Sequence, residues 1–290
     1  MKAALSWRRA EPYALLLPTA ALVAAVSLYP LAYLFYVAAH TTSYFNLGEW
    51  AGFGNFVDLF ASGAGRNSIV ASLVFVVVSD ALVVTIGLGL AIVFEAPVRG
   101  RGTIRTLVMV PWLASEVVVA LLWQAMLNAE FGPIPGAIDR AFHTHVDILG
   151  TAGGAMGALI IANVWRSYPF AFILFLAALQ GIPEEVYEAA RLDGADRWQQ
   201  LHAVVLPHLS RTLAIVVILM SFQFITLVTL SLILTGGGPN GATDVLPLRI
   251  WRQAFEYYRF GSASAAGVVL FALNLVLSVV YIRRFVMREN

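Results

Sequence analysis

The sequence predicts an all-α polytopic membrane protein with six transmembrane helices. Its 290 residues are 60% hydrophobic and only 12% charged, whereas soluble domains carry about a quarter charged residues. The apolar residues gather in runs of about twenty or more, which is the length that a helix needs to cross about 30 Å of hydrocarbon. The longest strongly polar stretch, Gly181 to Arg211, stands apart from these runs. We therefore expect a helical bundle in a bilayer, with one compact polar segment outside it.

Six apolar runs are the predicted membrane spans. The first follows a basic N-terminus, is too long for a signal-peptide core and has no small-residue cleavage pattern, so we expect it to be retained. The runs extend over about Tyr13–Ala39, Ile69–Phe94, Ile104–Leu127, Ala155–Gln180, Thr212–Thr235 and Ala263–Phe285.

The distribution of basic residues predicts that both termini are cytoplasmic, because cytoplasmic loops carry an excess of Lys and Arg. This orientation places six basic residues outside: Arg66, Arg140, Arg166, Arg249, Arg252 and Arg259. It places twelve inside: Lys2, Arg8, Arg9, Arg99, Arg101, Arg105, Arg191, Arg197, Arg211, Arg283, Arg284 and Arg288. We divide the chain into residues 1–67, with the N-terminus, first span and first external loop, and a transmembrane domain over 68–286 with a cytoplasmic loop at 181–211.

The composition argues against several classes of function. There is no cysteine, and the net charge of +1 gives no footprint for nucleic acid. The only lysine is Lys2, so the chain has no GxxxxGK[ST] phosphate loop and cannot be its own P-loop ATPase. The scattered histidines lack acidic neighbours at metal-ligand spacing, and no catalytic motif is present. We predict no enzyme activity, no catalytic residues, no cofactor and no metal.

The polar stretch predicts two short helices joined by a turn. Pro183 suits a first helical turn, and acidic residues directly after it lie at the positive end of the helix dipole. Gly194 favours the left-handed conformation that ends a helix. Asp196 is a good cap for a second helix, which Pro207 should break or bend.

Part of this stretch resembles the cytoplasmic EAA loop of ABC importer permeases. The resemblance rests on Glu188-Ala189-Ala190, then Gly194, Val204 and Leu206-Pro207 at fixed offsets, with Val204 where isoleucine is usual. Two adjacent alanines on a short helix let a partner approach closely, and flanking charges can orient it. An ordinary amphipathic surface loop is the alternative interpretation. The resemblance implies that the residues which couple the chain to an ATPase are Glu188, Ala189, Ala190, Arg191, Asp193 and Gly194.

Two external stretches are similar to the carbohydrate branch of these importers: Gly52-Phe53-Gly54-Asn55-Phe56 and Thr235-Gly236-Gly237-Gly238-Pro239. The glycines by themselves require only that a helix ends and the chain reverses there. The resemblance covers about Pro12 to Arg284 and implies the fold of a type I importer transmembrane domain in the bacterial plasma membrane. It also implies four partners: a pair of ABC ATPase subunits, a second related permease, an extracytoplasmic solute-binding protein and a sugar.

A polar solute crossing hydrocarbon needs polar groups that replace its water, and sugars also stack on aromatic rings. Trp112 and Glu116 are four positions apart on the third helix and should share a face, and Asn163, Ser167 and Phe170 should share one on the fourth. A polar and aromatic patch on the fifth helix lies at Gln223 and Phe224. The predicted solute path comprises Trp112, Glu116, Asn163, Arg166, Ser167, Phe170, Gln223 and Phe224.

Alternatives stay open at these positions and for the function. Asn163 and Gln223 could bond across helices as packing contacts. Glu116 could lie at the wet outer mouth, and Arg166 could form a salt bridge in that mouth and not touch the solute. Asp80 should be buried and structural. The pairs Gly153/Gly157 and Gly87/Gly89 favour close helix packing. The alternative functions are an ion-coupled carrier acting alone, an intramembrane enzyme, and the same importer type carrying glycerol phosphate or another polar solute.

Overall fold

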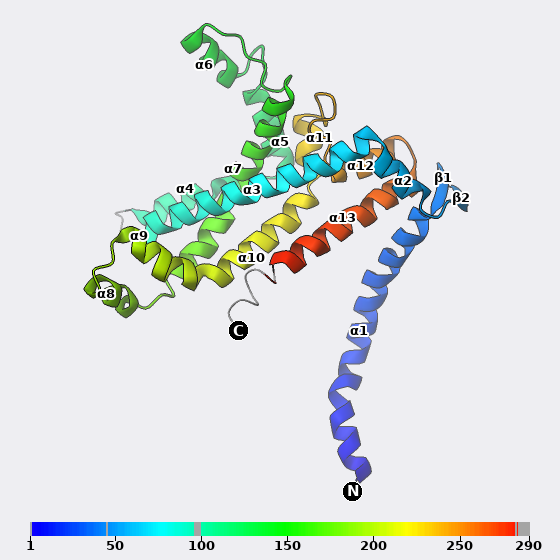
Figure 1. Ribbon diagram of the computed structural model, residues 1–290, viewed down its shortest axis with the longest axis horizontal. Coiled ribbons are helices and arrows are strands. Elements are labelled where there is room, and N and C mark those ends of the chain that lie inside the picture. Colours follow the sequence, from blue (N-terminus) through cyan, green and yellow to red (C-terminus); the bar gives the residue numbers. More distant parts are fainter. Residues whose placement is uncertain (1, 45, 96–99, 282, 284–290) are drawn as a thin grey trace.

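The computed structural model describes residues 2–44, 46–95, 100–281 and 283, and these are mostly helical (Figure 1). Arg99, Arg284, Arg288 and the predicted end of the last span therefore lie outside the described residues. The helices and strands are α1 (Lys2–Ala38), β1 (His40–Ser43), β2 (Asn46–Trp50), α2 (Gly54–Ala61), α3 (Gly63–Glu95), α4 (Arg101–Leu113), α5 (Glu116–Met126), α6 (Pro133–Phe142), α7 (Ala152–Leu179), α8 (Glu184–Leu192), α9 (Arg197–Gln200), η1 (Leu201–Val205), α10 (Leu206–Ile225), α11 (Thr229–Leu234), α12 (Leu246–Trp251), η2 (Arg252–Glu256) and α13 (Phe260–Tyr281).

Five helical stretches in the described part of the chain are long and apolar enough to cross a membrane, and a sixth crossing is possible if one bent pair counts as a single span. The five are Leu16–Ala38, Gly63–Glu95, Ala152–Leu179, Arg197–Ile225 and Phe260–Tyr281. Each overlaps a predicted span. The predicted division between residues 67 and 68 falls inside α3.

The third predicted span is broken, so the prediction of one continuous helix there is wrong. α4 ends at Leu113, α5 begins at Glu116, and the two are bent by 93°. The cause is local: Ala114 is extended, and the Ser115 hydroxyl caps the new helix by accepting a hydrogen bond from the Val118 N–H at 3.3 Å. Trp112 and Glu116 therefore lie on different helices and do not share a helical face.

The fifth predicted span also differs from the prediction. α10 ends at Ile225 rather than continuing to Thr235, because the Thr226 hydroxyl bonds to the carbonyls of Phe222 and Gln223 and α11 turns aside to pack against α5. At its start Pro207 does not end the helix. A π-helical turn, η1, precedes it and carries the chain from α9 into α10.

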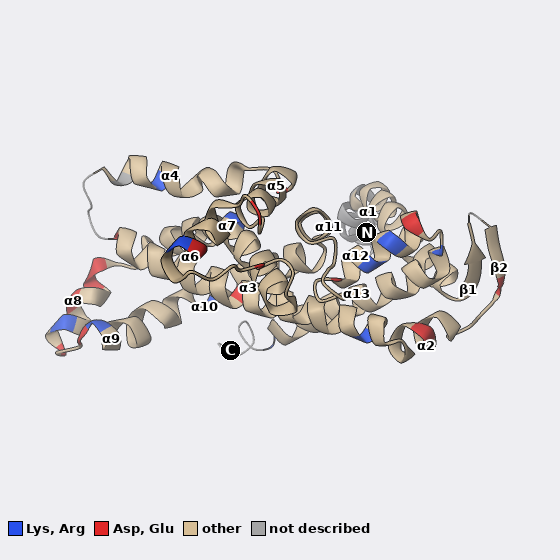
Figure 2. Cartoon of the chain, turned by 90° about the horizontal axis from the view of Figure 1, so that it is seen from above, with Lys and Arg blue, Asp and Glu red and all other residues tan. Residues whose placement is uncertain are grey.

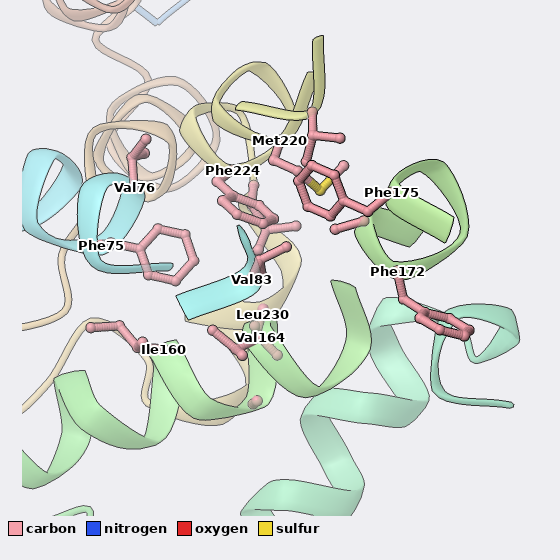
Figure 3. Close-up of a cluster of buried hydrophobic side chains, with 14 of the residues drawn as sticks. Phe75, Val76, Val83, Ile160, Val164, Phe172, Phe175, Met220, Phe224 and Leu230 are labelled. Carbon is pink, nitrogen blue, oxygen red and sulfur yellow. The ribbon is translucent and has the colours of Figure 1, made fainter. Parts of the chain in front are cut away.

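The hydrophobic core lies between α3, α7, α10 and α11 (Figure 3). Phe75 of α3 and Phe224 of α10 meet there with ring centroids 6.3 Å apart. Gly87 permits close approach of α3 to α7, since a Cβ there would lie 2.8 Å from the Cβ of Ala171. The similar prediction for Gly89, Gly153 and Gly157 is wrong within this chain, because a Cβ at each would meet nothing within 4 Å.

The predicted first external loop contains a feature that the all-helical prediction lacked, an antiparallel hairpin of β1 and β2. Asn55 of α2 ties this loop to the end of α1, because its Nδ2 donates to the carbonyls of Ala38 and His40 at 2.8 and 2.9 Å. Beyond this contact α1 packs against α13, where Leu34 lies beside Gly267, and toward its N-terminus α1 diverges from the other helices (Figure 1). Only 6% of the most apolar stretch of α1 is buried, compared with 61% of the corresponding stretch of α7.

Side-chain bonds fix which helix ends share a side of the bundle. At its start, α3 is bonded to the loop before α12, and at its end Glu95 is bonded to Tyr187 of α8. The charged residues gather around α8 and α9 and again at the opposite end, around α2 and α12 (Figure 2). Arg166 belongs to neither group. It lies in the middle of α7, fourteen residues after Ala152 and thirteen before Leu179, so counting it among the basic residues on the outside is wrong.

Candidate functional site

The coupling segment, residues 181–211, folds as the sequence predicts. α8 follows directly after Pro183, and Gly194 ends this helical unit in the left-handed conformation with φ +80°. Asp196 then caps α9 in a capping box, in which its side chain accepts from the Gln199 N–H at 2.8 Å and Gln199 reciprocates. Local signals therefore set the end of α8 and the start of α9.

The face of α8 that is turned away from the other helices is exposed. Glu188, Ala189 and Arg191 of α8 are exposed and Ala190 is half-buried, while Asp193 and Gly194 are exposed just beyond the helix. Two large apolar side chains beside them, Leu192 and Trp198, are 89% and 72% exposed. An uncovered apolar surface rimmed by charge is typical of a protein-binding site. The coupling role of the six predicted residues itself stays a prediction.

The inner face of α8 is held by one buried polar contact. Tyr187 is 9% exposed, and its hydroxyl donates to Oε1 of Glu95, the last residue of α3, at 3.0 Å. Burial, together with the hydrogen bond to Glu95, raises the pKa of the Tyr187 hydroxyl well above its usual range. The hydroxyl therefore stays protonated and able to donate. Sequence reasoning missed this pair, because its members are 92 positions apart.

A polar and aromatic cluster formed by Trp112, Glu116, Arg166 and Phe170 lies where α4 and α5 meet the middle of α7. The ring centroids of Trp112 and Phe170 are 5.9 Å apart in a stacked arrangement. Nη2 of Arg166 lies 3.5 Å from Oε1 of Glu116, with side chains 16% and 29% exposed. Nε of Arg166 also donates to the Ala114 carbonyl at 3.4 Å, which the break between α4 and α5 leaves without a helical partner. Charged groups at membrane depth are costly, so they mark a candidate functional site.

The other four predicted path residues are not part of this cluster. Asn163 and Ser167 are 1% and 2% exposed, and neither Nδ2 of Asn163 nor Oγ of Ser167 has a partner among the described residues. Gln223 is half-buried near the end of α10. Phe224 is 1% exposed and points into the core toward Phe75 (Figure 3). In this conformation Phe224 offers no surface to a solute, and its place in the solute path stays a prediction.

Asp80 is 5% exposed within α3, and the prediction that it is buried is confirmed. Its Oδ2 accepts a hydrogen bond from the Ser221 hydroxyl of α10, and the Tyr281 hydroxyl of α13 lies 3.2 Å from that same Ser221 oxygen. The three residues link α3, α10 and α13. Among the residues that the structure describes, no group of three or more His, Cys, Asp or Glu side chains could hold a metal ion.

At the end of the bundle opposite α8, side chains from several elements meet at Asp244. We call this group the outer network. Asp244 is 9% exposed, and its carboxylate accepts from Ser68 of α3 at 3.0 Å and from Arg252 at 3.3 Å, with Arg249 at 3.8 Å. Arg252 also donates to the Gly236 carbonyl. The glycine-rich loop, residues 235–239, packs against this network. Gly236 follows the short helix α11, whereas the prediction placed it at the end of one long fifth helix. The reversal expected of that loop is confirmed.

Taken together, these features are typical of a membrane-embedded transport subunit with an exposed segment that a partner protein can bind. The bundle has apolar spans with a charged cluster at mid-depth, and it presents one exposed coupling segment at one end. The chain belongs to the family of binding-protein-dependent transport system inner membrane components, whose sequence model matches residues 83–283.

Curated relatives and solved structures agree with this family. The chain is 32% identical to a probable ABC transporter permease of Brucella suis over 280 residues, which cover 95% of this chain and 96% of the relative. It is 30% identical to the trehalose/maltose transport system permease MalF of Thermococcus litoralis, with 96% and 95% covered. Its fold is similar to that of a chain in a bacterial ABC transporter involved in import of the acidic polysaccharide alginate, with a TM-score of 0.79, 25% identity and 98% of both chains covered.

The resemblance inferred from the sequence is therefore confirmed. The chain is a multi-pass inner membrane permease of a binding-protein-dependent ABC importer, and ATP is hydrolysed by a separate subunit. A transport system of this family also depends on a binding protein.

Proposed function

We propose that the chain forms half of the path of an ATP-driven sugar importer, together with a second, related permease. The observation that carries the sugar assignment is the polar and aromatic cluster, which sets a stacked Trp112/Phe170 pair beside the charged groups of Glu116 and Arg166. Aromatic rings suit the C–H faces of a sugar, and polar groups suit its hydroxyls. The relative from Thermococcus, a trehalose/maltose permease, supports the same class of solute.

In this proposal a pair of ABC ATPase subunits moves the permease through α8. Glu188, Ala189, Ala190 and Arg191 on the helix, with Asp193 and Gly194 after it, seat the segment in a cleft of one ATPase subunit. Closure of the ATPase pair on ATP then shifts the bundle from inward-open to outward-open, and the binding protein releases its sugar into the path. Two ATPase clefts and one coupling segment per chain call for a second permease. The exposed apolar surface of α1 offers area for it or for lipid.

The remaining path assignments are part of the same proposal. Asn163, Ser167, Gln223 and Phe224 line the path in conformations in which their helices move apart. We also retain the division into residues 1–67 and 68–286, and cytoplasmic termini with the segment 181–211 on the same side.

The orientation can be tested by thiol labelling, because the chain contains no cysteine of its own. Leu192→Cys would add a thiol at an 89% exposed position of α8, and Phe131→Cys would add one at a 72% exposed position before α6. A membrane-impermeant maleimide applied to intact cells should label Phe131→Cys and leave Leu192→Cys unlabelled until the membrane is opened. The reverse pattern would contradict the proposed orientation.

The transport function is tested by reconstituting the chain with its ATPase, second permease and binding protein in proteoliposomes. We expect a sugar, delivered by the binding protein, to stimulate ATP hydrolysis and to accumulate inside only when ATP is present on the coupling-segment side. Uptake by the chain alone, driven by an ion gradient without ATP, would instead support an ion-coupled carrier. A panel that includes glycerol phosphate separates sugars from other polar solutes.

A further inference from the structure

The guanidinium of Arg166 is already occupied within the chain. Its Nη2 faces Glu116 Oε1 at 3.5 Å and its Nε donates to the Ala114 carbonyl at 3.4 Å. The side chain is only 16% exposed. Both partners follow from the break between α4 and α5, which frees the Ala114 carbonyl and places Glu116 in the first turn of α5. The bent span thus holds the cation in place.

The charges of the predicted path cancel. Among its eight residues Arg166 is the only cation and Glu116 the only anion, and the two are paired with each other. A solute with a phosphate or carboxylate group would lose its hydration at membrane depth and would need an unpaired cation in exchange. The described part of this path offers none. An uncharged sugar needs only hydrogen bonds to its hydroxyls and an aromatic surface for its C–H faces. The polar groups of Glu116 and Arg166 and the Trp112/Phe170 pair supply these.

We infer that this half of the path is specific for uncharged saccharides, and that Glu116 determines this specificity by occupying Arg166. The inference rests on the proposed sugar-import function and names its solute class. Glu116 then acts as a specificity-determining residue: it neutralises the cation that would otherwise attract an anionic sugar. Removing the Glu116 charge while keeping its shape should convert the site into one that accepts anions.

The experiment measures solute binding to the purified transporter complex without the binding protein, because that protein makes its own selection. The probes are radiolabelled maltose as the neutral sugar and an oligomer of alginate as the anionic one, each at increasing concentration. For the unaltered complex we expect maltose to bind and the alginate oligomer to bind at least about 10-fold more weakly. In Glu116→Gln the ratio of the affinity for the alginate oligomer to the affinity for maltose should rise by about 10- to 100-fold, since a charge-assisted hydrogen bond to Arg166 becomes available to the anion.

Two further variants make the result specific. The double variant Glu116→Gln with Arg166→Gln also disrupts the pair but adds no net charge, so it should keep the preference for maltose. Glu130→Gln removes the same charge from an exposed position outside the predicted path and should leave the ratio unchanged. If Glu116→Gln is unstable, Arg166→Gln alone provides the opposite test, because it leaves Glu116 unpaired and should weaken anion binding further.

The outcomes separate the inference from the function on which it rests. Equal binding of maltose and the alginate oligomer by the unaltered complex would overturn the inference and leave a sugar importer. The same holds for a Glu116→Gln complex whose ratio does not move, or a double variant that shifts as far as the single one. A complex that neither binds nor imports any saccharide would overturn the proposed function as well.

Discussion

The two ends of the bundle are held together in different ways. At the outer end Asp244 gathers Ser68, Arg249 and Arg252 from separate elements into one network. At the other end the Tyr187 hydroxyl of α8 donates a buried hydrogen bond to Glu95 of α3, with apolar packing around it. A junction in which several polar groups share one buried carboxylate resists relative movement more than a junction in which apolar packing surrounds a buried hydrogen bond.

This difference indicates where the chain is built to move. α8 continues through α9 and the π-helical turn η1 into α10, and it touches α3 through Tyr187. α3 packs along α7, which carries Arg166 and Phe170 of the cluster. A force on α8 can therefore reach the predicted path by two routes while the outer network keeps the far end fixed. Three substitutions, given from the largest expected effect to the smallest, test this comparison.

Gly194→Pro should have the largest effect. Gly194 has φ +80°, whereas proline requires about −65°, so the turn between α8 and α9 cannot form. We expect ATP-driven uptake to fall by about 100-fold or more, because the docking surface is displaced. The measurement is uptake by the reconstituted complex, with insertion checked by membrane fractionation. Gly194→Asn should lose far less, since asparagine tolerates the left-handed conformation. Equal loss in both variants would contradict a conformational cause.

The coupling segment could be predicted well from the sequence because its signals are local. Pro183, Gly194 and Asp196 each act within a few residues of where they stand, and the structure has a helix start or end at each. The broken third span had a comparable signal in Ser115 followed by Glu116. It was missed because the surrounding run is apolar and long enough to span as one helix.

The features that could not be predicted depend on contacts between distant segments. Nothing in the sequence near Asp244 indicates that Ser68, 176 positions away, completes its network. The spacing of Phe224 identifies a helical face, but only the packing of α10 against α3 shows that this face is the core. For Arg166 the sequence allowed a salt bridge with no certain partner, and the bend between α4 and α5 supplies both Glu116 and the Ala114 carbonyl.

Asp244→Ala should have the second largest effect and should act on the outer end alone. It leaves Arg249 and Arg252 without their shared carboxylate, and their side chains are only 17% and 25% exposed. We expect the free energy of unfolding to fall by about 2–4 kcal/mol, measured by thermal or denaturant unfolding of the purified chain in detergent. Asp58→Ala, at an exposed carboxylate on the same side of the bundle, is the matched control and should change it by less than about 0.5 kcal/mol. Similar losses in both variants would mean that the network does not hold the outer end.

Tyr187→Phe should have the smallest effect, and it tests the Tyr187–Glu95 hydrogen bond at the inner end. The ring remains to fill its buried position, and only the hydroxyl that donates to Glu95 is lost. One hydrogen bond corresponds to about a 3- to 10-fold effect, so we expect the number of sugars moved per ATP hydrolysed to fall by that factor. The measurement is uptake and ATP hydrolysis in the same proteoliposomes. Tyr257→Phe, which removes a hydroxyl from an exposed residue at the other end, should keep the ratio.

A double-mutant cycle identifies the cause of that loss. Glu95→Gln removes the charged acceptor while keeping its shape, and it should lower the ratio by a similar factor. If the two residues act only through their bond, the double variant should be no worse than the more severe single variant, because the bond can be lost only once. Losses that multiply would show that Tyr187 and Glu95 act independently, and the inner end would then be held by apolar packing alone. The ATPase rate without sugar separates these cases from simple misfolding, since a complex that still assembles hydrolyses ATP while its transport declines.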